Sequence, residues 1–372
     1  MYMQHRTRIG RRLKAARDRA GLTQQQLADS LGLKHRQSVA RIEDGERALA
    51  ANEFIMAMDV LGVDLDYFTD AFRLEGEGEF SFRTSPGVST AVVDEFERRA
   101  GRWIATYREL SREQGQRPRW LGHALNLRRT SSFEDAMAAG EAVAHRFDLG
   151  RCPAERLRAV MEDRLRIVVL DVDAPHGVSG AASRIPGFSC VLINRREPEG
   201  RRNFDLAHEL FHLLTWDAMP PERTEAVEVR RRGKGSRTEK LAENFAAAVL
   251  MPGIIVKKHW ESRSRSADPH DRLKEGAARL RVSASAYKWR LRNLGLLSRR
   301  EIDALDDERL TANDRSRCGA PSLFSRPFVK LIAVALDTGR LSVQRAATIL
   351  GLSLPDLAAL LQSYGHEAYF EA

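Results

Sequence analysis

The sequence predicts a mostly α-helical protein of the α+β class overall, with all-α regions near both ends and a small central sheet. Three observations support this fold class. Apolar residues recur at helical spacing over residues 9–61 and 328–364. Residues 165–194 hold three short runs of the kind that form buried strands. Two further helical segments follow these runs, at residues 201–214 and 239–252.

Composition limits the class of protein. The chain has 372 residues, enough for two or three domains, and its 60 Lys and Arg against 51 acidic residues give a net charge of +9. This excess favours a polyanionic partner. The scattered Cys152, Cys190 and Cys318 lack metal-ligand spacing and are typical of free thiols. Because we find neither an apolar run near the roughly 20 residues of a membrane span nor a signal peptide, we expect a cytoplasmic protein with no membrane partner.

Residues 7–70 predict a domain of short helices. The first helix ends near Gly21, and Thr23 has the character of an N-cap for the second, with Gln26 as its capping-box partner. The second helix ends at Gly32, and a third follows at once. Two short helices joined at a glycine turn form a helix-turn-helix.

These helices resemble the Cro/C1-type (Xre) family of DNA-binding domains. The motifs that match are Leu22-Thr23-Gln24, Leu27-Ala28, Leu31-Gly32, Ile42-Glu43-x-Gly45 and Leu61-Gly62-Val63-Asp64-Leu65. The family's usual Pro-Ser is replaced here by Ala48-Leu49-Ala50. The resemblance implies that the third helix lies in the major groove of double-stranded DNA.

By position in that family, the residues that read bases lie at the start of the third helix. They are His35, Arg36, Gln37 and Ser38, with Arg41 one turn further on. Arg36 can pair with two atoms of guanine, and Gln37 with two atoms of adenine. Gln24, at a helix start, is the expected phosphate contact. The alternative is a helical protein-interaction module whose basic residues are only solvated.

Residues 71–130 predict a linker followed by a long helix. Residues 72–90 are rich in Gly, Ser and charged side chains, as linkers are. From 92 to 114, apolar and aromatic residues recur every three or four positions, around Trp103. Such a face packs in a core or against a second copy more often than it binds nucleic acid. We expect a homodimer, with this helix as one candidate for the contact.

The segment 201–214 contains the pattern His-Glu-x-x-His. His208 and His212 are four residues apart on one helical face, so together they can hold one metal ion. Glu209 lies about 100° around the helix from His208, which puts its carboxylate beside the metal, within reach of a proton on a water molecule. The alternative is a pair of core or solvated histidines.

The second helical segment, residues 239–252, offers further carboxylates. Glu239 and Glu243 are four apart, so both can face the first helix. A catalytic zinc ion takes three protein ligands and keeps one position open. Glu239 would complete a His-His-Glu set for Zn²⁺, and Glu243 could accept the free ring N–H of a ligating histidine. The alternative is an ordinary solvated pair of glutamates.

Together these segments resemble the ImmA/IrrE-type metallopeptidase family. The matching motifs are Gly200 through Phe204, Leu206-Ala207-His208-Glu209 through His212, Glu239-x-x-Ala242, Phe245-Ala246 and Leu250-Met251-Pro252. The resemblance implies a zincin-like α+β domain over residues 131–300, with His208, His212 and Glu239 as zinc ligands and Glu209 as general base. Asp205 stands where the family usually has Ser or Thr, and Glu243 where Asp or Asn is commoner. The implied substrate is a repressor or antitoxin-like protein.

The three predicted strands cover residues 165–171, 177–183 and 188–194. Edge strands beside such sites commonly bind an extended peptide, and the small residues around Gly180 would permit that approach. The loop 223–238 holds a basic run, Arg230-Arg231-Arg232-Gly233-Lys234-Gly235. It is either a lid or electrostatic handle, or a solvated loop.

Residues 301–372 predict a C-terminal helical region. It has helix-turn-helix shape, but its second helix is acidic and apolar, so we expect an assembly surface. The whole sequence predicts a DNA-binding transcription regulator that carries a zinc metallopeptidase domain. Two alternatives stay open. One is a pure DNA-binding regulator with a structural or sensing zinc site, and the other is an antitoxin whose peptidase fold only binds a partner.

Overall fold

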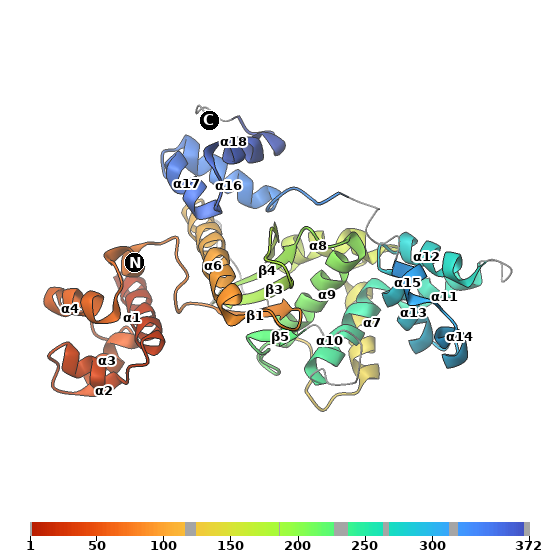
Figure 1. The fold of residues 1–372 in the computed structure, drawn as a ribbon, viewed down its shortest axis with the longest axis horizontal. Helices are drawn as coiled ribbons and strands as arrows, with labels where there is room; N and C mark the ends of the chain where they lie inside the picture. Colours follow the sequence, from red (N-terminus) through yellow and green to blue (C-terminus); the bar gives the residue numbers. More distant parts are fainter. Residues whose placement is uncertain are drawn as a thin grey trace. The chain divides into compact units, whose positions relative to one another are not determined.

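The computed structural model describes residues 2–115, 124–185, 187–226, 237–262, 268–311 and 319–367. Helices dominate, and five strands form one sheet (Figure 1), which confirms the predicted fold class. The chain divides into two compact units. The first comprises residues 1–79, 94–117 and 330–372, and the second residues 80–93 and 118–329. The four-part domain division stays a prediction.

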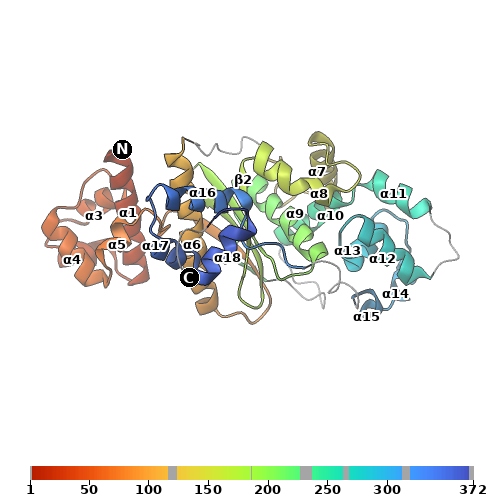
Figure 2. The same ribbon diagram turned by 90° about the horizontal axis from the view of Figure 1, so that it is seen from above.

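The first unit begins with five helices, seen as one cluster in Figure 2. They are α1 (Tyr2–Arg19), α2 (Gln24–Ser30), α3 (Arg36–Glu43), α4 (Ala51–Leu61) and α5 (Leu65–Thr69). Leu13, Leu27, Ile42 and Phe68 are at most 1% exposed in their shared core. The predicted capping box of α2 is confirmed, because the Thr23 hydroxyl accepts from Gln26 N and the Gln26 side chain accepts from Thr23 N.

The same unit contains a long helix and three C-terminal helices. They are α6 (Thr90–Glu113), α16 (Arg326–Asp337), α17 (Val343–Leu350) and α18 (Leu354–Ser363). The apolar face predicted for α6 is buried, with Trp103 only 1% exposed. Arg340 donates to both carboxylate oxygens of Glu113, which ties the C-terminal helices to α6.

The second unit is built on a mixed sheet. Its strands are β1 (Glu79–Thr84), β2 (Ile167–Val172), β3 (Val178–Ile185), β4 (Phe188–Asn194) and β5 (Thr224–Ala226), in the order β2-β4-β3-β1-β5. Strand β4 pairs parallel with β2 and antiparallel with β3, while β1 pairs parallel with β5. The three strands predicted between residues 165 and 194 are confirmed.

Two predictions about the edge of this sheet are wrong. Residues 79–84 were expected in a linker, yet they form β1, in which Phe80 and Phe82 stack 5.5 Å apart. Phe80 and Phe82 alternate with Ser81 and Arg83, which matches the two-residue period of a strand. Residues on both faces of this strand are buried, so the segment forms a strand although the surrounding sequence is polar. Strand β3, expected to offer a free edge, lies between β4 and β1. Strand β5 begins inside the predicted basic loop, whose run Arg230 to Gly235 lies outside the described residues.

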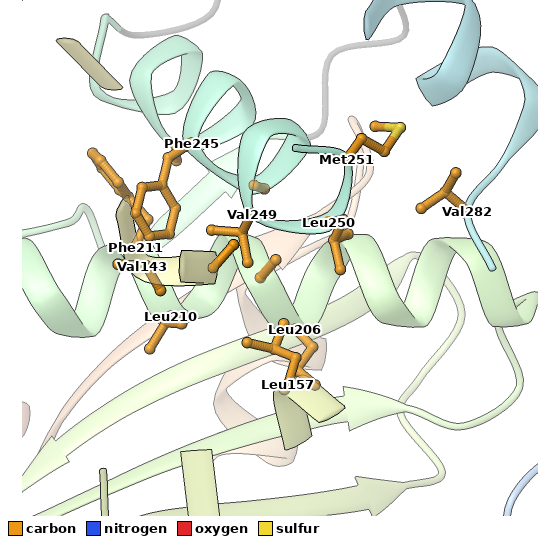
Figure 3. Packing of buried hydrophobic residues seen from close by; sticks show 14 of the residues in the cluster. Val143, Leu157, Leu206, Leu210, Phe211, Phe245, Val249, Leu250, Met251 and Val282 are labelled. Carbon is orange, nitrogen blue, oxygen red and sulfur yellow. The ribbon is translucent and has the colours of Figure 1, made fainter. Parts of the chain in front are cut away.

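The remaining elements of this unit are helices. They are α7 (Phe133–Arg146), α8 (Pro153–Ala159) with a π-helical turn (Val160–Arg164), α9 (Glu199–Thr215), α10 (Arg237–Leu250), α11 (Gly253–Glu261), α12 (Pro269–Arg279), α13 (Ala284–Asn293), α14 (Arg299–Asp303) and α15 (Asp307–Thr311). Figure 3 shows α9 between the sheet and α10, with Leu206 and Leu210 toward the strands and Phe211 beside Phe245. This packing fixes the helix that carries the His-Glu-x-x-His pattern.

Two further findings concern cysteines and membranes. Cys190 is buried and Cys152 half-buried, both as free thiols, and Cys318 lies outside the described residues. Among the described helices, none by itself has the length and apolar character to cross a bilayer. Helices α17 and α18 taken together meet these criteria by length and composition only, with a bend of 86° between them.

Candidate functional site

Helix α9 brings the predicted metal ligands into the interior of the second unit. Every residue from 205 to 215 is buried. Leu206, Leu210 and their apolar neighbours pack in the core, and this holds the intervening polar residues in place. His208 and His212 are 0% exposed, and Glu209 is 1% exposed. Buried polar side chains at this density are costly unless they have partners, which points to a site and not to ordinary core packing.

Glu239, on the first turn of α10, meets the two histidines. Its Oε2 lies 3.1 Å from His208 Nε2 and its Oε1 lies 3.4 Å from His212 Nε2, while the two Nε2 atoms are 3.0 Å apart. One ligand atom from each residue falls in a cluster within 4.8 Å. Tetrahedral ligands at zinc distances would be about 3.3 Å apart. The three side chains therefore fit one zinc ion, with ligand types that zinc prefers.

Burial sets the charge of the two histidines. It lowers the pKa of His208 to about 4, an effect to which the Arg83 guanidinium adds and which Glu239 opposes. Burial also lowers the pKa of His212 to about 4, against the opposing effect of Glu239. Both rings are therefore neutral near pH 7, and a neutral ring is the form that binds metal.

Glu209 lies against the sheet, whereas Glu243 does not reach the histidines. A Cβ built on Gly180 of β3 would stand 3.8 Å from Glu209 Oε1, so the missing side chain leaves room beside this carboxylate. The contact predicted for Glu243 is not formed. Glu243 is exposed, and the buried Nδ1 of His208 has no hydrogen-bond partner among the described residues. One more helical turn, about 5.4 Å, carries Glu243 away from the cluster.

Helix α3 presents its predicted base-reading residues to solvent. His35, Arg36 and Gln37 are exposed at its start and Ser38 is partly exposed, while Val39 and Ile42 are buried against the other helices. Arg41 is also exposed and lies 3.5 Å from Glu46. The structure thus brings these five residues onto an exposed part of α3. Their contacts with DNA stay a prediction.

Comparisons with known proteins match both regions. The helix-turn-helix model matches residues 13–68, and the model of the IrrE N-terminal-like domain, a peptidase family, matches residues 162–292. The chain joins an Xre-type helix-turn-helix domain to an IrrE-like domain. This confirms the predicted fusion. The expected metal ligands, His208, His212 and Glu239, all lie within the second match.

Whole-chain comparisons add little. No curated protein matches the chain in sequence. Among solved structures, the apo form of the competence regulator ComR from Streptococcus vestibularis is 13% identical, over 97% of this chain and 99% of that one. Its TM-score is 0.17, too low to support a conclusion about fold or function.

Sequence reasoning missed Arg83, which reaches the site from outside the matched IrrE-like residues. Its Nη1 lies 2.7 Å from Asp205 Oδ1, and the side chains are 8% and 1% exposed. The signal was the alternation of residues 80–84, in which the charged Arg83 stands between Phe82 and Thr84. In the sequence, Asp205 stands out only as a departure from the family pattern.

Gln24 of the helix-turn-helix domain is engaged within the fold. Its Nε2 donates to Glu43 Oε2 at 2.8 Å, and Glu43 also accepts from Arg17 Nε at 2.6 Å. Arg17 and Glu43 are buried, so this cluster joins α1, the start of α2 and the end of α3. Gln24 therefore has a structural partner that the sequence did not reveal. Its predicted phosphate contact stays a prediction.

Proposed function

We propose that this protein is a DNA-binding transcription regulator whose IrrE-like domain is a zinc-dependent metallopeptidase. The observation that carries the proposal is the meeting of His208, His212 and Glu239, with their ligand atoms within 4.8 Å, next to the buried Glu209. Two neutral imidazoles and one carboxylate are a zinc ligand set of the catalytic kind, which keeps a position open.

The residues around the cluster have distinct roles in this proposal. Zinc, when bound, supplies a Lewis acid that polarises a peptide carbonyl and lowers the pKa of water. Glu209 accepts a proton from the attacking water and passes it to the leaving amine. His208 and His212 stay neutral because burial lowers their pKa values to about 4. The absent side chain of Gly180 leaves space for a substrate backbone beside Glu209.

The helix-turn-helix domain would bring the protein to double-stranded DNA. Residues 35–37 and Arg41 are exposed on α3 and Ser38 is partly exposed, in keeping with insertion into a major groove. One such helix contacts too few base pairs to select a site, so we propose a homodimer on a palindromic operator, with its two α3 helices about 34–36 Å apart. By resemblance, the protein substrate is a repressor or an antitoxin-like protein.

Zinc content and substrate trapping test this proposal together. We expect about one zinc ion per chain in the wild type and in Glu209→Gln, and none in His212→Ala. His145→Ala, which removes an exposed histidine of the same unit, is the matched control and should keep its zinc. Glu209→Gln used as bait should retain a protein that the wild type cleaves.

The other outcomes identify the alternatives. Zinc binding without cleavage of any captured protein would indicate a regulator whose site is structural or sensing. A stable complex that the wild type also leaves intact would indicate an antitoxin-like binding module. Full zinc occupancy in a variant with His208, His212 and Glu239 all replaced by Ala would overturn the ligand assignment.

A further inference from the structure

Strand β1 lies close to the helix that carries the metal ligands, because its Arg83 pairs with Asp205 of α9. It pairs beside β3, the strand whose Gly180 faces Glu209. Ser85 N donates to Gly177 O at 2.6 Å, so the end of β1 lies at the start of β3. An extended peptide that binds by strand addition pairs with the exposed side of a strand through main-chain hydrogen bonds. In this chain residues 79–84 already pair with that side of β3, and β5 pairs with their other side.

Arg83 anchors this strand to the helix of the metal ligands. Its guanidinium pairs with Asp205, which lies three residues before His208 on α9, and both side chains are nearly excluded from solvent. Replacing a buried ion pair with packed apolar residues is often neutral or stabilising. Stability alone therefore does not account for a charged pair at this position.

The electrostatic surroundings place Arg83 in the field of the site. Burial lowers the pKa of Arg83, but Asp205, Glu209, Glu243 and Glu239 together outweigh it and raise that pKa above its ordinary value. A cation supplied from outside residues 162–292 thus pairs with Asp205, three residues before the first histidine of the proposed metal site.

We propose that residues 79–84 act as an internal pseudosubstrate, and that Asp205 is a subsite that selects an arginine side chain of the peptide substrate. This inference rests on the proposed peptidase function and names the substrate class for the same site. Strand addition supplies affinity through the backbone, and pockets for alternate side chains supply specificity. In β1 the side chain that fills such a pocket is Arg83.

The chemistry of the subsite defines what it takes. Asp205 Oδ1 accepts from Arg83, and Oδ2 is buried, 3.7 Å from Arg201 Nε. A planar guanidinium presents paired donors that match both oxygens of a carboxylate, whereas an ammonium is a single point of charge. The substrate is therefore an extended protein segment with arginine at the position that corresponds to Arg83. It must displace β1 in order to bind.

Peptide binding to the full-length, zinc-free protein tests the subsite without relying on turnover. The probe is a fluorescent peptide with the sequence of residues 79–84, compared with the same peptide carrying alanine in place of its arginine. Because a tethered strand competes at high effective concentration, Arg83→Ala should bind the probe at least about tenfold more tightly than the wild type. Adding Asp205→Asn should abolish that gain. Arg158→Ala, which breaks a half-buried pair with Asp171 elsewhere in the unit, is the control and should bind as the wild type does.

Hydrogen exchange follows the strand itself. Arg83→Ala should raise amide exchange in residues 79–84 and 178–185 and leave residues 167–172 unchanged. If Arg83→Ala unfolds, Arg83→Lys can replace it, because lysine keeps a positive charge. Arg83→Lys should bind the probe more tightly than the wild type does, but by less than the tenfold gain expected for Arg83→Ala. Equal binding of the arginine and alanine peptides, or unchanged exchange in β1, would overturn the inference.

Turnover separates this inference from the peptidase proposal. If zinc-loaded Arg83→Ala binds the arginine probe but cleaves no peptide or captured protein, the peptidase function fails and the subsite stands. If the variant cleaves peptides without preferring arginine, the peptidase function stands and the subsite fails. Loss of cleavage in Arg83→Ala while exchange in β1 stays slow would make Arg83 a catalytic group and overturn the pseudosubstrate role.

Discussion

Helices α9 and α3 both carry predicted functional residues, but one buries them and the other exposes them. On α9, His208, Glu209 and His212 are at most 1% exposed and are held by core packing. On α3, Arg36 and Gln37 are exposed, and only the opposite face is packed. The first helix is built to hold a small ligand in fixed geometry. The second offers side chains that gain their partners only in a complex.

Because of this difference, substitutions in the two units should affect function and stability differently. A buried site is coupled to packing, so changes there affect ligand binding and stability together. An exposed site can lose function while its domain keeps its stability. A change on α3 that lowers stability, or a change on α9 that lowers zinc binding but not stability, would contradict this distinction.

The largest expected effect is the loss of zinc on changing a ligand. His212→Ala removes one of three proposed ligands, so stoichiometric zinc should disappear, as measured by metal analysis after dialysis. DNA affinity, measured by gel shift, should stay unchanged, because residues 13–68 hold the complete helix-turn-helix match. A fall in DNA affinity on zinc loss would mean that the two regions are coupled.

The second largest effect is a loss of stability when a glycine at a close helix contact is replaced by alanine, and each unit offers one such glycine. In the helix-turn-helix domain, a Cβ on Gly10 would clash with Ile42 O and lie 2.6 Å from Glu43 O. In the IrrE-like unit, a Cβ on Gly140 would lie 2.5 Å from Phe245 O. Each Gly→Ala change should cost about 3 kcal/mol or more of unfolding free energy, because helix backbones must separate.

Each variant should lower the melting temperature and abolish the function of its own unit only. Gly10→Ala should lose DNA binding and keep zinc, and Gly140→Ala should do the reverse. Gly115→Ala places its Cβ in open space but at a positive φ of 73°, so it is a poor control. Ala15→Gly and Ala139→Gly, at partly exposed helix positions, are the better ones, with expected losses of about 1 kcal/mol. If either variant lost both DNA binding and zinc, the two units would not fold independently of each other.

The sequence predicted the local parts of both sites better than their surroundings. Helical spacing placed His208 and His212 on one face, and the capping box at Thr23 marked the start of α2, because both depend on residues a few positions apart. Arg83 and Asp205 are 122 residues apart, and no local pattern joins them. The linker prediction failed for the same reason, since pairing with β3 and β5 makes residues 79–84 a strand.

The third prediction concerns base reading by α3. Gln37→Ala should cost about 1–3 kcal/mol on the preferred operator and leave binding to random DNA nearly unchanged, because an adenine-specific pair is lost. Gln24→Ala should weaken both kinds of DNA alike if it contacts a phosphate. It should also lower the melting temperature slightly, since its hydrogen bond to Glu43 is lost. Equal losses on operator and random DNA for Gln37→Ala would reduce α3 to an electrostatic dock.

The smallest effect expected is an opposite response of the two units to pH. In the IrrE-like unit, burial raises the pKa of Glu162 to about 7, from an ordinary value of 4.5. The folded state therefore binds the proton more tightly than the unfolded state between these values. Stability falls as pH rises from about 4.5 through about 7, because the buried carboxyl must ionise.

Glu53 of the helix-turn-helix domain has the opposite sign. Its hydrogen bonds from Arg47, of 2.6 and 2.9 Å, lower the pKa of its carboxyl below 4.5, so the stability it contributes is lost as pH falls through the lowered value. Glu162→Gln should stabilise its unit at pH 8 by about 1 kcal/mol, less than the full shift would give because the side chain is partly exposed, and should have no effect below pH 4.5. Glu53→Gln should destabilise its domain at pH 8, and this effect should vanish once the pH falls through the lowered pKa of Glu53. Melting curves at both pH values, followed by zinc retention for one unit and DNA binding for the other, distinguish the two. A gain from Glu162→Gln at low pH, where both states are protonated, would show that packing and not ionisation governs this position.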